Sequence, residues 1–411
     1  MISGLTHALG PFALKSFRFQ WPADLLTSWA GEMEGIILSW YIIVETGSVL
    51  LLTVYGSLQY LGTLLSPLFG VMGDRIGHRN LLCIMRAGYC VFATTIMTLA
   101  FTGIIRPTYI LIVAACMGMI RSSDLVMRNA LVGASMPPQV LVSAASVMRT
   151  TMDSARIAGS LTGAGLIALL GMAHAYIFIA IFYASSFCLT FGVYRSPKSD
   201  MPRAFTPLRD LGEGFRYVWN TPAAVSAMAL AVLVNLTAFP MSQGLLPYVA
   251  REIYRIDQQG LGFLIASFAC GSLAGSIALS FGGRAWGMAR LMIVSMLGWY
   301  ALLLVFPLLP NAKAGMVVLM IAGFAQSLAM VPMSVILLRT AEDRLRGRVM
   351  GVRMLAVYSL PIGLLGAGVL IQHVGYAPTV AIYCTIGIGA ALLIALRWRT
   401  QLWEEEPGTT R

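Results

Sequence analysis

The chain is poor in charge and almost free of lysine. Of its 411 residues only 11% are charged, and the three lysines are Lys15, Lys198 and Lys313. Soluble domains carry about twice this share of charge. None of the lysines follows a glycine, so the chain has no G-x-x-x-x-G-K-[ST] loop to hold nucleotide phosphates. This excludes an internal ATP-driven engine, and we predict no ATP partner.

Histidine and cysteine are also scarce, and neither forms a catalytic or metal-binding pattern. No H-E-x-x-H and no C-x-x-C occurs among the four histidines and six cysteines. We therefore predict no metal and no other cofactor, and an intramembrane enzyme is disfavoured. The cysteines lie in apolar runs and are predicted to be small buried residues: Cys83, Cys90, Cys116, Cys188, Cys270 and Cys384.

Long apolar runs dominate what is present. The chain is 58% hydrophobic with a mean hydropathy of +0.79, and a membrane-crossing helix needs about 20 apolar residues. The runs predict an all-α polytopic membrane protein with twelve transmembrane helices. The predicted spans are 23–45, 47–72, 81–103, 107–133, 141–169, 173–194, 222–250, 258–281, 289–309, 313–338, 349–372 and 376–397.

The net charge of +11 follows membrane topology. Outside the spans, lysine and arginine fall on the side of the N-terminus, with four exceptions: Arg106, Arg251, Arg255 and Lys313. By the positive-inside rule, both termini are predicted to be cytoplasmic. The basic balance therefore indicates a lipid bilayer as partner, and we predict no nucleic-acid partner.

A proline-punctuated connector divides the chain. We predict an N-terminal six-span bundle over residues 1–194, a cytoplasmic connector over 195–221, and a C-terminal six-span bundle with a short cytoplasmic tail over 222–411. A helix starting at Thr206-Pro207 would place apolar residues along one face, which suits a helix lying in the membrane interface. The alternative is a mobile linker. The apolar residues are Leu208, Leu211, Phe215, Val218 and Trp219.

The link between the second and third spans carries the most specific motif. Gly70, Asp74, Arg75, Gly77 and Arg79 match G-x-x-x-D-R-x-G-x-R in a tight turn, where glycine accepts a positive φ. This element resembles the signature loop of the major facilitator superfamily. The resemblance implies two pseudo-symmetric six-helix bundles, a small-molecule substrate and transport by alternating access.

Further stretches resemble one branch of that superfamily, which contains the enterobactin exporter and similar bacterial efflux proteins. They are Leu211–Val218, Leu246-Pro247 and Arg346-Gly347-Arg348-Val349. This resemblance implies a monomer of the bacterial inner membrane that exports a siderophore or amphipathic drug in exchange for protons. In the fifth span, Ser160 replaces the proline of the G-P-x-x-G-G antiporter element. Proton-coupled uptake or facilitated diffusion of a small metabolite therefore stays open, as do a non-transporting sensor and an intramembrane enzyme.

The resemblance also implies a cytoplasmic gate. The acid Asp74 would contact the start of the eleventh span, near Val349 to Arg353, where exposed N–H groups and the helix dipole favour a carboxylate. The cations Arg75 and Arg79 would help to hold this side closed. The predicted gate residues are Gly70, Asp74, Arg75, Gly77, Arg79, Arg346 and Arg348.

Ionisable residues inside the spans are candidates for the transport site, because charge at bilayer depth is costly. Most of them lie about 14–24 Å from the cytoplasmic ends. Spans 4 and 5 each place an acid between two arginines on one helical face, and internal pairing and a transport role are both open. The candidates are Glu32, Glu34, Arg121, Asp124, Arg128, Asp153 and Arg156, with Arg149 nearer the surface.

The two glutamates of the first span differ from the triplets. Glu32 and Glu34 are two residues apart and point to different faces of a helix. Glu32 is the first candidate for a coupling site, because a carboxyl group can take up and release a proton. The second half has no acid in its spans, so its candidates are hydrogen-bonding residues: Asn235, Gln243 and Gln326. This division suits an organic substrate with charged or hydrogen-bonding groups.

The gate hypothesis makes one prediction. Asp74→Asn should slow transport, because the neutral amide weakens the contact that closes the cytoplasmic side. Substrate binding, measured in parallel, should remain. Normal turnover in this variant would remove the gate assignment.

Overall fold

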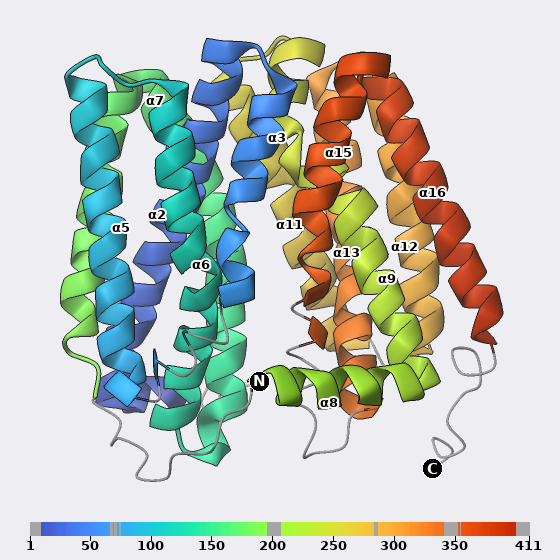
Figure 1. Cartoon of the computed structure of the whole chain (residues 1–411), viewed down its shortest axis with the longest axis horizontal. Coiled ribbons are helices and arrows are strands. Elements are labelled where there is room, and N and C mark those ends of the chain that lie inside the picture. Colours follow the sequence, from blue (N-terminus) through green and yellow to red (C-terminus); the bar gives the residue numbers. More distant parts are fainter. Residues whose placement is uncertain are drawn as a thin grey trace. The chain divides into compact units, whose positions relative to one another are not determined.

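The computed structural model describes residues 10–65, 69, 72–73, 75–194, 207–282, 287–340, 352–353 and 355–399. All regular structure in these ranges is helical (Figure 1). The N-terminal half contains η1 (Gly10–Ala13), α2 (Lys15–Thr46), α3 (Val49–Leu58), η2 (Leu61–Leu65), α5 (His78–Phe101), α6 (Pro107–Ser135) and α7 (Pro138–Thr190). The C-terminal half contains α8 (Pro207–Asn220), α9 (Pro222–Phe239), η3 (Pro240–Gly244), α10 (Leu246–Tyr248), η4 (Val249–Ile253), α11 (Gln258–Gly282), α12 (Met288–Val305), η5 (Phe306–Leu308), α13 (Ala312–Thr340), α15 (Ser359–Val374) and α16 (Tyr376–Arg397).

The described helices confirm the all-α membrane fold. Eight of them are long and apolar enough to cross a bilayer, and Val49–Thr63 and Ser359–Val374 are shorter apolar helices. The helix that contains the first predicted span, α2, starts at Lys15, eight residues before that span. Charged residues beyond the apolar stretch mark the edge of the hydrocarbon layer, and a helix can extend past that edge.

The fifth and sixth predicted spans meet at Gly171, inside α7. This glycine has φ +76° and ψ 172°, which interrupts the helix. Trp29 of α2 contacts both parts of α7: its indole N–H donates to Thr162 Oγ1 at 2.8 Å, and its ring packs edge-on against Phe182. Both parts therefore lie along α2 as an antiparallel hairpin, and only glycine reverses the chain here without steric cost.

Packing divides the chain into two compact units. The first comprises Met1–Leu51, Leu58–Phe205 and Ile256–Ala266, and the second comprises Leu52–Ser57, Thr206–Arg255 and Ser267–Arg411. A short stretch of α3 thus belongs to the second unit, where Ser57 Oγ donates to the Pro361 carbonyl at 3.1 Å. The bundle boundaries at residues 194 and 222 remain predictions.

The predicted connector helix is present as α8. It lies across the ends of the neighbouring helices of its unit (Figure 1). Val218 is buried, whereas Phe215 and Trp219 are exposed and stack with their ring centroids 5.8 Å apart. An exposed aromatic pair beside the charged Arg216 fits an interfacial helix, and the contact with a membrane stays a prediction.

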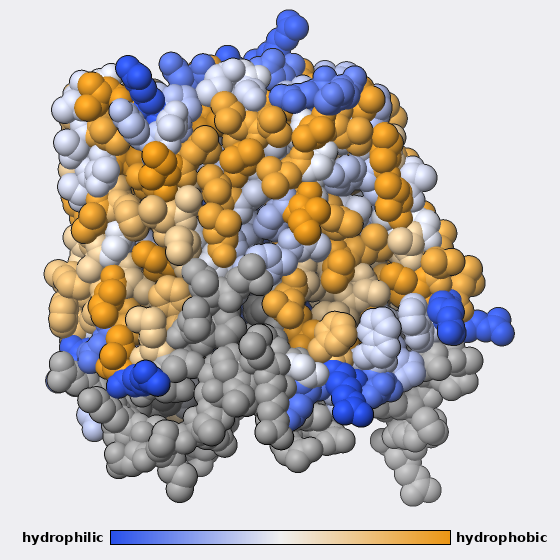
Figure 2. All heavy atoms as spheres, viewed as in Figure 1, coloured by the Kyte–Doolittle hydropathy of each residue, from blue (hydrophilic) through white to orange (hydrophobic). Residues whose placement is uncertain are grey.

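Apolar side chains cover much of the outer surface. In Figure 2, hydrophobic side chains cover large parts of the visible face, and the most hydrophilic ones lie towards its upper and lower edges. Several large side chains are more than half exposed, among them Val91, Leu169, Val294, Leu393 and Leu396. Such a surface suits lipid. The prediction that all six cysteines are buried is confirmed only for Cys83 and Cys384. Cys90 and Cys116 are half-buried, and Cys188 and Cys270 are exposed, because lipid accepts small apolar side chains as readily as the interior does.

Small residues bring α2 and α7 into close contact. A Cβ atom at Gly159 would lie 2.6 Å from Cβ of Glu32, and one at Gly163 would lie 2.8 Å from Cα of Met33. Backbones this close leave no room for a methyl group, as expected for helix packing in membranes. The small-residue element of the fifth span therefore fixes α7 against the part of α2 that carries the two glutamates.

Gly163→Ala should lower the thermal unfolding midpoint in detergent. The added methyl group meets the Met33 backbone, and overpacking of this kind costs about 1–3 kcal/mol. Gly165→Ala is the matched control, because a Cβ atom there meets nothing within 4 Å. It should leave the midpoint unchanged or raise it. Equal effects of the two variants would contradict the close contact.

Candidate functional site

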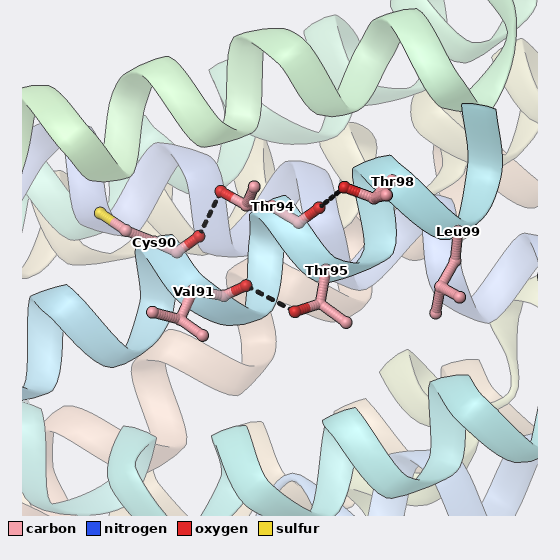
Figure 3. A pocket seen from close by; sticks show the side chains of 6 residues that line it. All are labelled: Cys90, Val91, Thr94, Thr95, Thr98 and Leu99. Atoms are coloured by element: carbon pink, nitrogen blue, oxygen red, sulfur yellow. Dashed lines mark hydrogen bonds between the residues drawn. The ribbon is translucent and has the colours of Figure 1, made fainter. Parts of the chain in front are cut away.

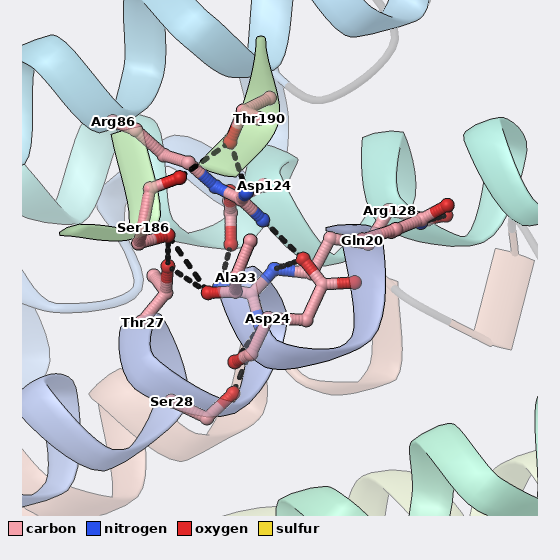
Figure 4. A network of polar contacts seen from close by, with 10 residues as sticks. All are labelled: Gln20, Ala23, Asp24, Thr27, Ser28, Arg86, Asp124, Arg128, Ser186 and Thr190. Atoms are coloured by element: carbon pink, nitrogen blue, oxygen red, sulfur yellow. Dashed lines mark hydrogen bonds and ion pairs between the residues drawn. The ribbon is translucent and has the colours of Figure 1, made fainter. Parts of the chain in front are cut away.

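A buried network of charged side chains joins three helices of the first unit (Figure 4). Asp24 of α2 forms an ion pair with Arg86 of α5, and both side chains are only 1% exposed. Arg86 also donates to Thr190 Oγ1 at the end of α7. A guanidinium group and a carboxylate thus neutralise each other where water is excluded.

A second arginine extends this network on α6. Arg128 forms an ion pair with Asp124, and its Nε lies 3.6 Å from Asp24 Oδ1. Its Nη1 donates to Ser28 Oγ at 2.8 Å, and Gln20 Nε2 donates to the Arg128 carbonyl at 3.2 Å. Two acids face two arginines, so the network carries no net charge. Its contacts point to a structural role.

Sequence reasoning found only half of this network. Asp124 and Arg128 are among the sequence-predicted candidates, whereas Asp24 and Arg86 are not. Arg86 lies inside the predicted third span, and Asp24 lies at the edge of the first. The same criterion, an ionisable residue within an apolar run, would have found both residues.

A second cluster surrounds Glu34 near the middle of α2. Glu34 is 2% exposed, and it accepts hydrogen bonds from Tyr183 Oη at 3.1 Å and Tyr176 Oη at 3.4 Å, both on α7. Arg121, at the midpoint of α6, lies close enough to Glu34 for their charges to interact, and it donates through Nη1 to Gln59 Oε1 at 2.7 Å. Glu34 therefore has hydroxyl donors on one helix and a neighbouring guanidinium on another.

Glu32 faces a different part of the unit, as its spacing from Glu34 predicts. Its Oε1 lies 3.7 Å from Arg156 Nε of α7, and both side chains are 35% exposed. The Glu32–Arg156 pair therefore combines a close charge contact with partial exposure.

The two arginine–acid–arginine triplets do not act as closed units. Asp124 pairs with Arg128, and Asp153 pairs with Arg149 at 3.4 Å, each within its own helix. Arg121 and Arg156 instead reach Gln59 and Glu32 on other helices. Helical spacing places both arginines of a triplet on the same face as its acid. An arginine side chain is long, however, and its guanidinium can instead reach a partner on a neighbouring helix, as those of Arg121 and Arg156 do.

The candidates of the second half lie in local hydrogen bonds or in irregular helix. Asn235 is buried and donates to the Ala231 carbonyl at 2.8 Å. Gln326 of α13 accepts from Ser272 of α11 at 3.1 Å. Gln243 lies in the π-helical turn η3, and such turns often occur at functional sites.

The gate candidates are only partly described. Gly70, Asp74, Arg346 and Arg348 lie outside the described residues. Gly77 has the predicted positive φ, +90°, just before α5. Arg75 is exposed. Arg79 donates to the carbonyls of Thr190 at 3.3 Å and Phe191 at 2.7 Å, so it caps the C-terminal end of α7.

A groove of about 500 Å³ runs along α5 (Figure 3). Its lining residues are Cys90, Val91, Thr94, Thr95, Thr98 and Leu99. The hydroxyls of its three threonines donate to α5 carbonyls four residues earlier. No lining side chain is ionisable at neutral pH in an ordinary environment, so the groove is a poor match for a charged substrate.

Apolar helices of membrane-crossing length that enclose buried ionic clusters are typical of a polytopic membrane protein with an internal polar site. The profile of the Major Facilitator Superfamily matches residues 23–357 and 228–411. The chain belongs to this superfamily, whose members bind small molecules within the membrane, and it is not an enzyme.

Individual relatives are distant. The multidrug efflux pump Tap of Mycolicibacterium fortuitum is 26% identical over 173 residues, which are 42% of this chain and 42% of that protein. The POT family transporter PepTSo has a TM-score of 0.74 at 12% identity, covering 94% of this chain and 98% of that chain. The D-xylose-proton symporter has a TM-score of 0.73 at 15% identity, covering 97% and 100%. These two structures show the fold alone, and the enterobactin-exporter branch stays a prediction.

Breaking the Asp24–Arg86 pair should destabilise the protein strongly. Asp24→Asn leaves the Arg86 charge buried without its ion partner, and such losses cost about 3–5 kcal/mol. Arg149→Gln is the control, because the Arg149 side chain is 69% exposed and exposed pairs contribute about 0–1 kcal/mol. Chemical or thermal unfolding in detergent measures both. A midpoint for Asp24→Asn equal to that of the wild type would contradict the structural role.

Proposed function

We propose that this protein exports a small organic molecule in exchange for protons by alternating access. The substrate class is a siderophore or an amphipathic drug. The match to a multidrug efflux pump supports export, although it covers less than half of that protein. The ionic groups of the first unit support proton coupling.

The observation that carries the proposal is the half-open ion pair of Glu32 and Arg156. Its side chains are 35% exposed at a depth where the surrounding helices are apolar. A charged pair facing hydrocarbon is costly, so polar groups at this depth face an internal path. The pair offers both signs of charge to a substrate on that path.

Glu34 is the proposed proton carrier of the same site. Its partners Tyr176 and Tyr183 are hydroxyl groups, which donate to a carboxylate and accept from a protonated carboxyl group. Glu34 therefore keeps hydrogen-bond partners in both protonation states. Arg121 balances its charge when the proton leaves. Sequence reasoning favoured Glu32 for this role, and the contacts of the two residues favour Glu34.

The remaining features of the proposal follow from the sequence. The positive-inside rule supports an inner-membrane protein with both termini in the cytoplasm. The loop residues Asp74, Arg75 and Arg79 are proposed to close the cytoplasmic side. We propose that the protein works as a monomer and without ATP. The altered antiporter element at Ser160 keeps proton-coupled uptake or facilitated diffusion as the second candidate.

Two variants should separate the roles of the glutamates. The assay is proteoliposomes with an internal pH dye and a panel of siderophores and cationic drugs. Glu34→Gln should abolish substrate-driven proton movement while substrate binding remains. Glu32→Gln should raise KM more than it lowers kcat, because it removes a group that contacts substrate.

Glu45→Gln is the matched control, because Glu45 lies on the same helix and is exposed. It should behave as the wild type. Substrate movement without proton movement in the wild type would make the protein a facilitator or a carrier of another ion. The proposed role of Glu34 would then be wrong.

A further inference from the structure

The second span is broken beside Arg121. Helix α3 ends at Leu58, Gln59 and Tyr60 form a turn, and the 3₁₀-helix η2 begins at Leu61. Broken helices in membranes occur where other parts of the protein satisfy the freed backbone groups, and in transporters they often line the substrate site. Residues at the break are therefore well placed to act on the site.

Two glycines press this broken segment against α6. A Cβ atom at Gly62 would collide with the Met119 carbonyl oxygen, and one at Gly118 would collide with the Leu58 carbonyl oxygen. Thr63 Oγ1 donates to Ser122 Oγ at 2.9 Å and joins the same two segments. The backbone of the turn thus lies directly on α6, one helical turn from Arg121.

This contact places Gln59 at the guanidinium of Arg121. Arg121 Nη1 donates to Gln59 Oε1 at 2.7 Å. A hydrogen bond from a charged donor at this distance is among the stronger ones in proteins. Since η2 starts two residues after Gln59, the break decides where the side chain of Gln59 points.

The other side of the guanidinium lies over Gly31 of α2. A Cβ atom at Gly31 would collide with Arg121 Nη2 and would lie 3.3 Å from Arg121 Cζ and 3.6 Å from Tyr183 Oη. Gly31 therefore leaves the space that Arg121 occupies, three residues before Glu34 on the same helix. The guanidinium is held between Gln59 on one side and the bare backbone of Gly31 on the other.

We infer that Gln59 and Gly31 are positioning residues, which hold Arg121 beside Glu34 so that its charge balances that carboxyl group when the proton leaves. The inference rests on the proposed function of Glu34. Neither residue is assigned a contact with the substrate. Both act through Arg121, so their effects should depend on the presence of that arginine.

A double-mutant cycle between Gln59 and Arg121 tests this role. The probe is ethidium, and the readout is ethidium-driven proton movement in proteoliposomes. Gln59→Leu should lower kcat about ten-fold, in line with the loss of a hydrogen bond to a charged group, and leave KM nearly unchanged. Gln59→Glu keeps an acceptor oxygen but adds a negative charge that competes with Glu34 for Arg121, so it should also lower the rate. In an Arg121→Gln background, Gln59→Leu should cause no further loss.

Two glycine variants test the other side of Arg121. Gly31→Ala displaces the guanidinium and should reduce kcat to a similar extent. Gly35→Ala, one turn further along α2, is the matched control, because a Cβ atom there meets nothing within 4 Å. It should transport normally. Equal rates for the two alanine variants would overturn the role of Gly31.

The thermal unfolding midpoint of the same variants, measured in detergent without substrate, separates this inference from the proposed function. Non-additive shifts for Gln59→Leu and Arg121→Gln support the contact even if the wild type moves no protons with ethidium, a result that would count against the proposed function. Additive shifts overturn the contact. Non-additive shifts of the unfolding midpoint together with a normal kcat for Gln59→Leu would overturn the positioning role, because the contact would then be only structural.

Discussion

The cost of burying charge governs the first unit. Removing an ion from water costs several kcal/mol even after relaxation, and only the attraction of a close partner of opposite charge offsets this desolvation penalty. Asp24 and Asp124 meet Arg86 and Arg128 where both acids and Arg86 have almost no solvent contact. This neutral network fixes α2, α5 and α6 relative to one another. The glutamates further along α2, which are proposed to bind substrate and protons, are thereby held on a rigid support.

Close backbone contact is the second constraint, and glycine supplies it. Gly159 and Gly163 bring α7 onto α2, and Gly62 and Gly118 bring the broken second span onto α6. Polar side chains at these contacts reach neighbouring helices over short distances. The arrangement of Glu32, Glu34 and Arg121 thus depends on residues that have no side chain.

The sequence predicts the fold well and the site only in part. Apolar runs and the loop motif are local signals, and they predicted the helices, the family and the positive φ of Gly77. Ion-pair partners depend on how helices face one another. Spacing within one helix therefore suggested triplets, while the structure pairs Glu32 with Arg156 across helices. The sequence does not mark Gln59 as a site residue, because its role depends on the helix break beside it, which the apolar pattern of the span does not predict.

A close helix–helix contact between two glycines occurs in both halves of the chain, and the polar residue that follows it differs. In the second unit, Gly271 of α11 and Gly323 of α13 face each other's helices, as Gly62 and Gly118 do in the first. Three residues after the α6 glycine stands Arg121, and three residues after the α13 glycine stands Gln326.

The partners of these two residues differ in the same way. Arg121 lies beside the acid Glu34, whereas Gln326 binds the neutral hydroxyl of Ser272. The repeated geometry therefore carries a charge in one half and a neutral hydrogen bond in the other. A carboxyl group changes its charge when it binds a proton, whereas an amide side chain does not titrate. Any response to protons at these paired positions must therefore originate in the first unit.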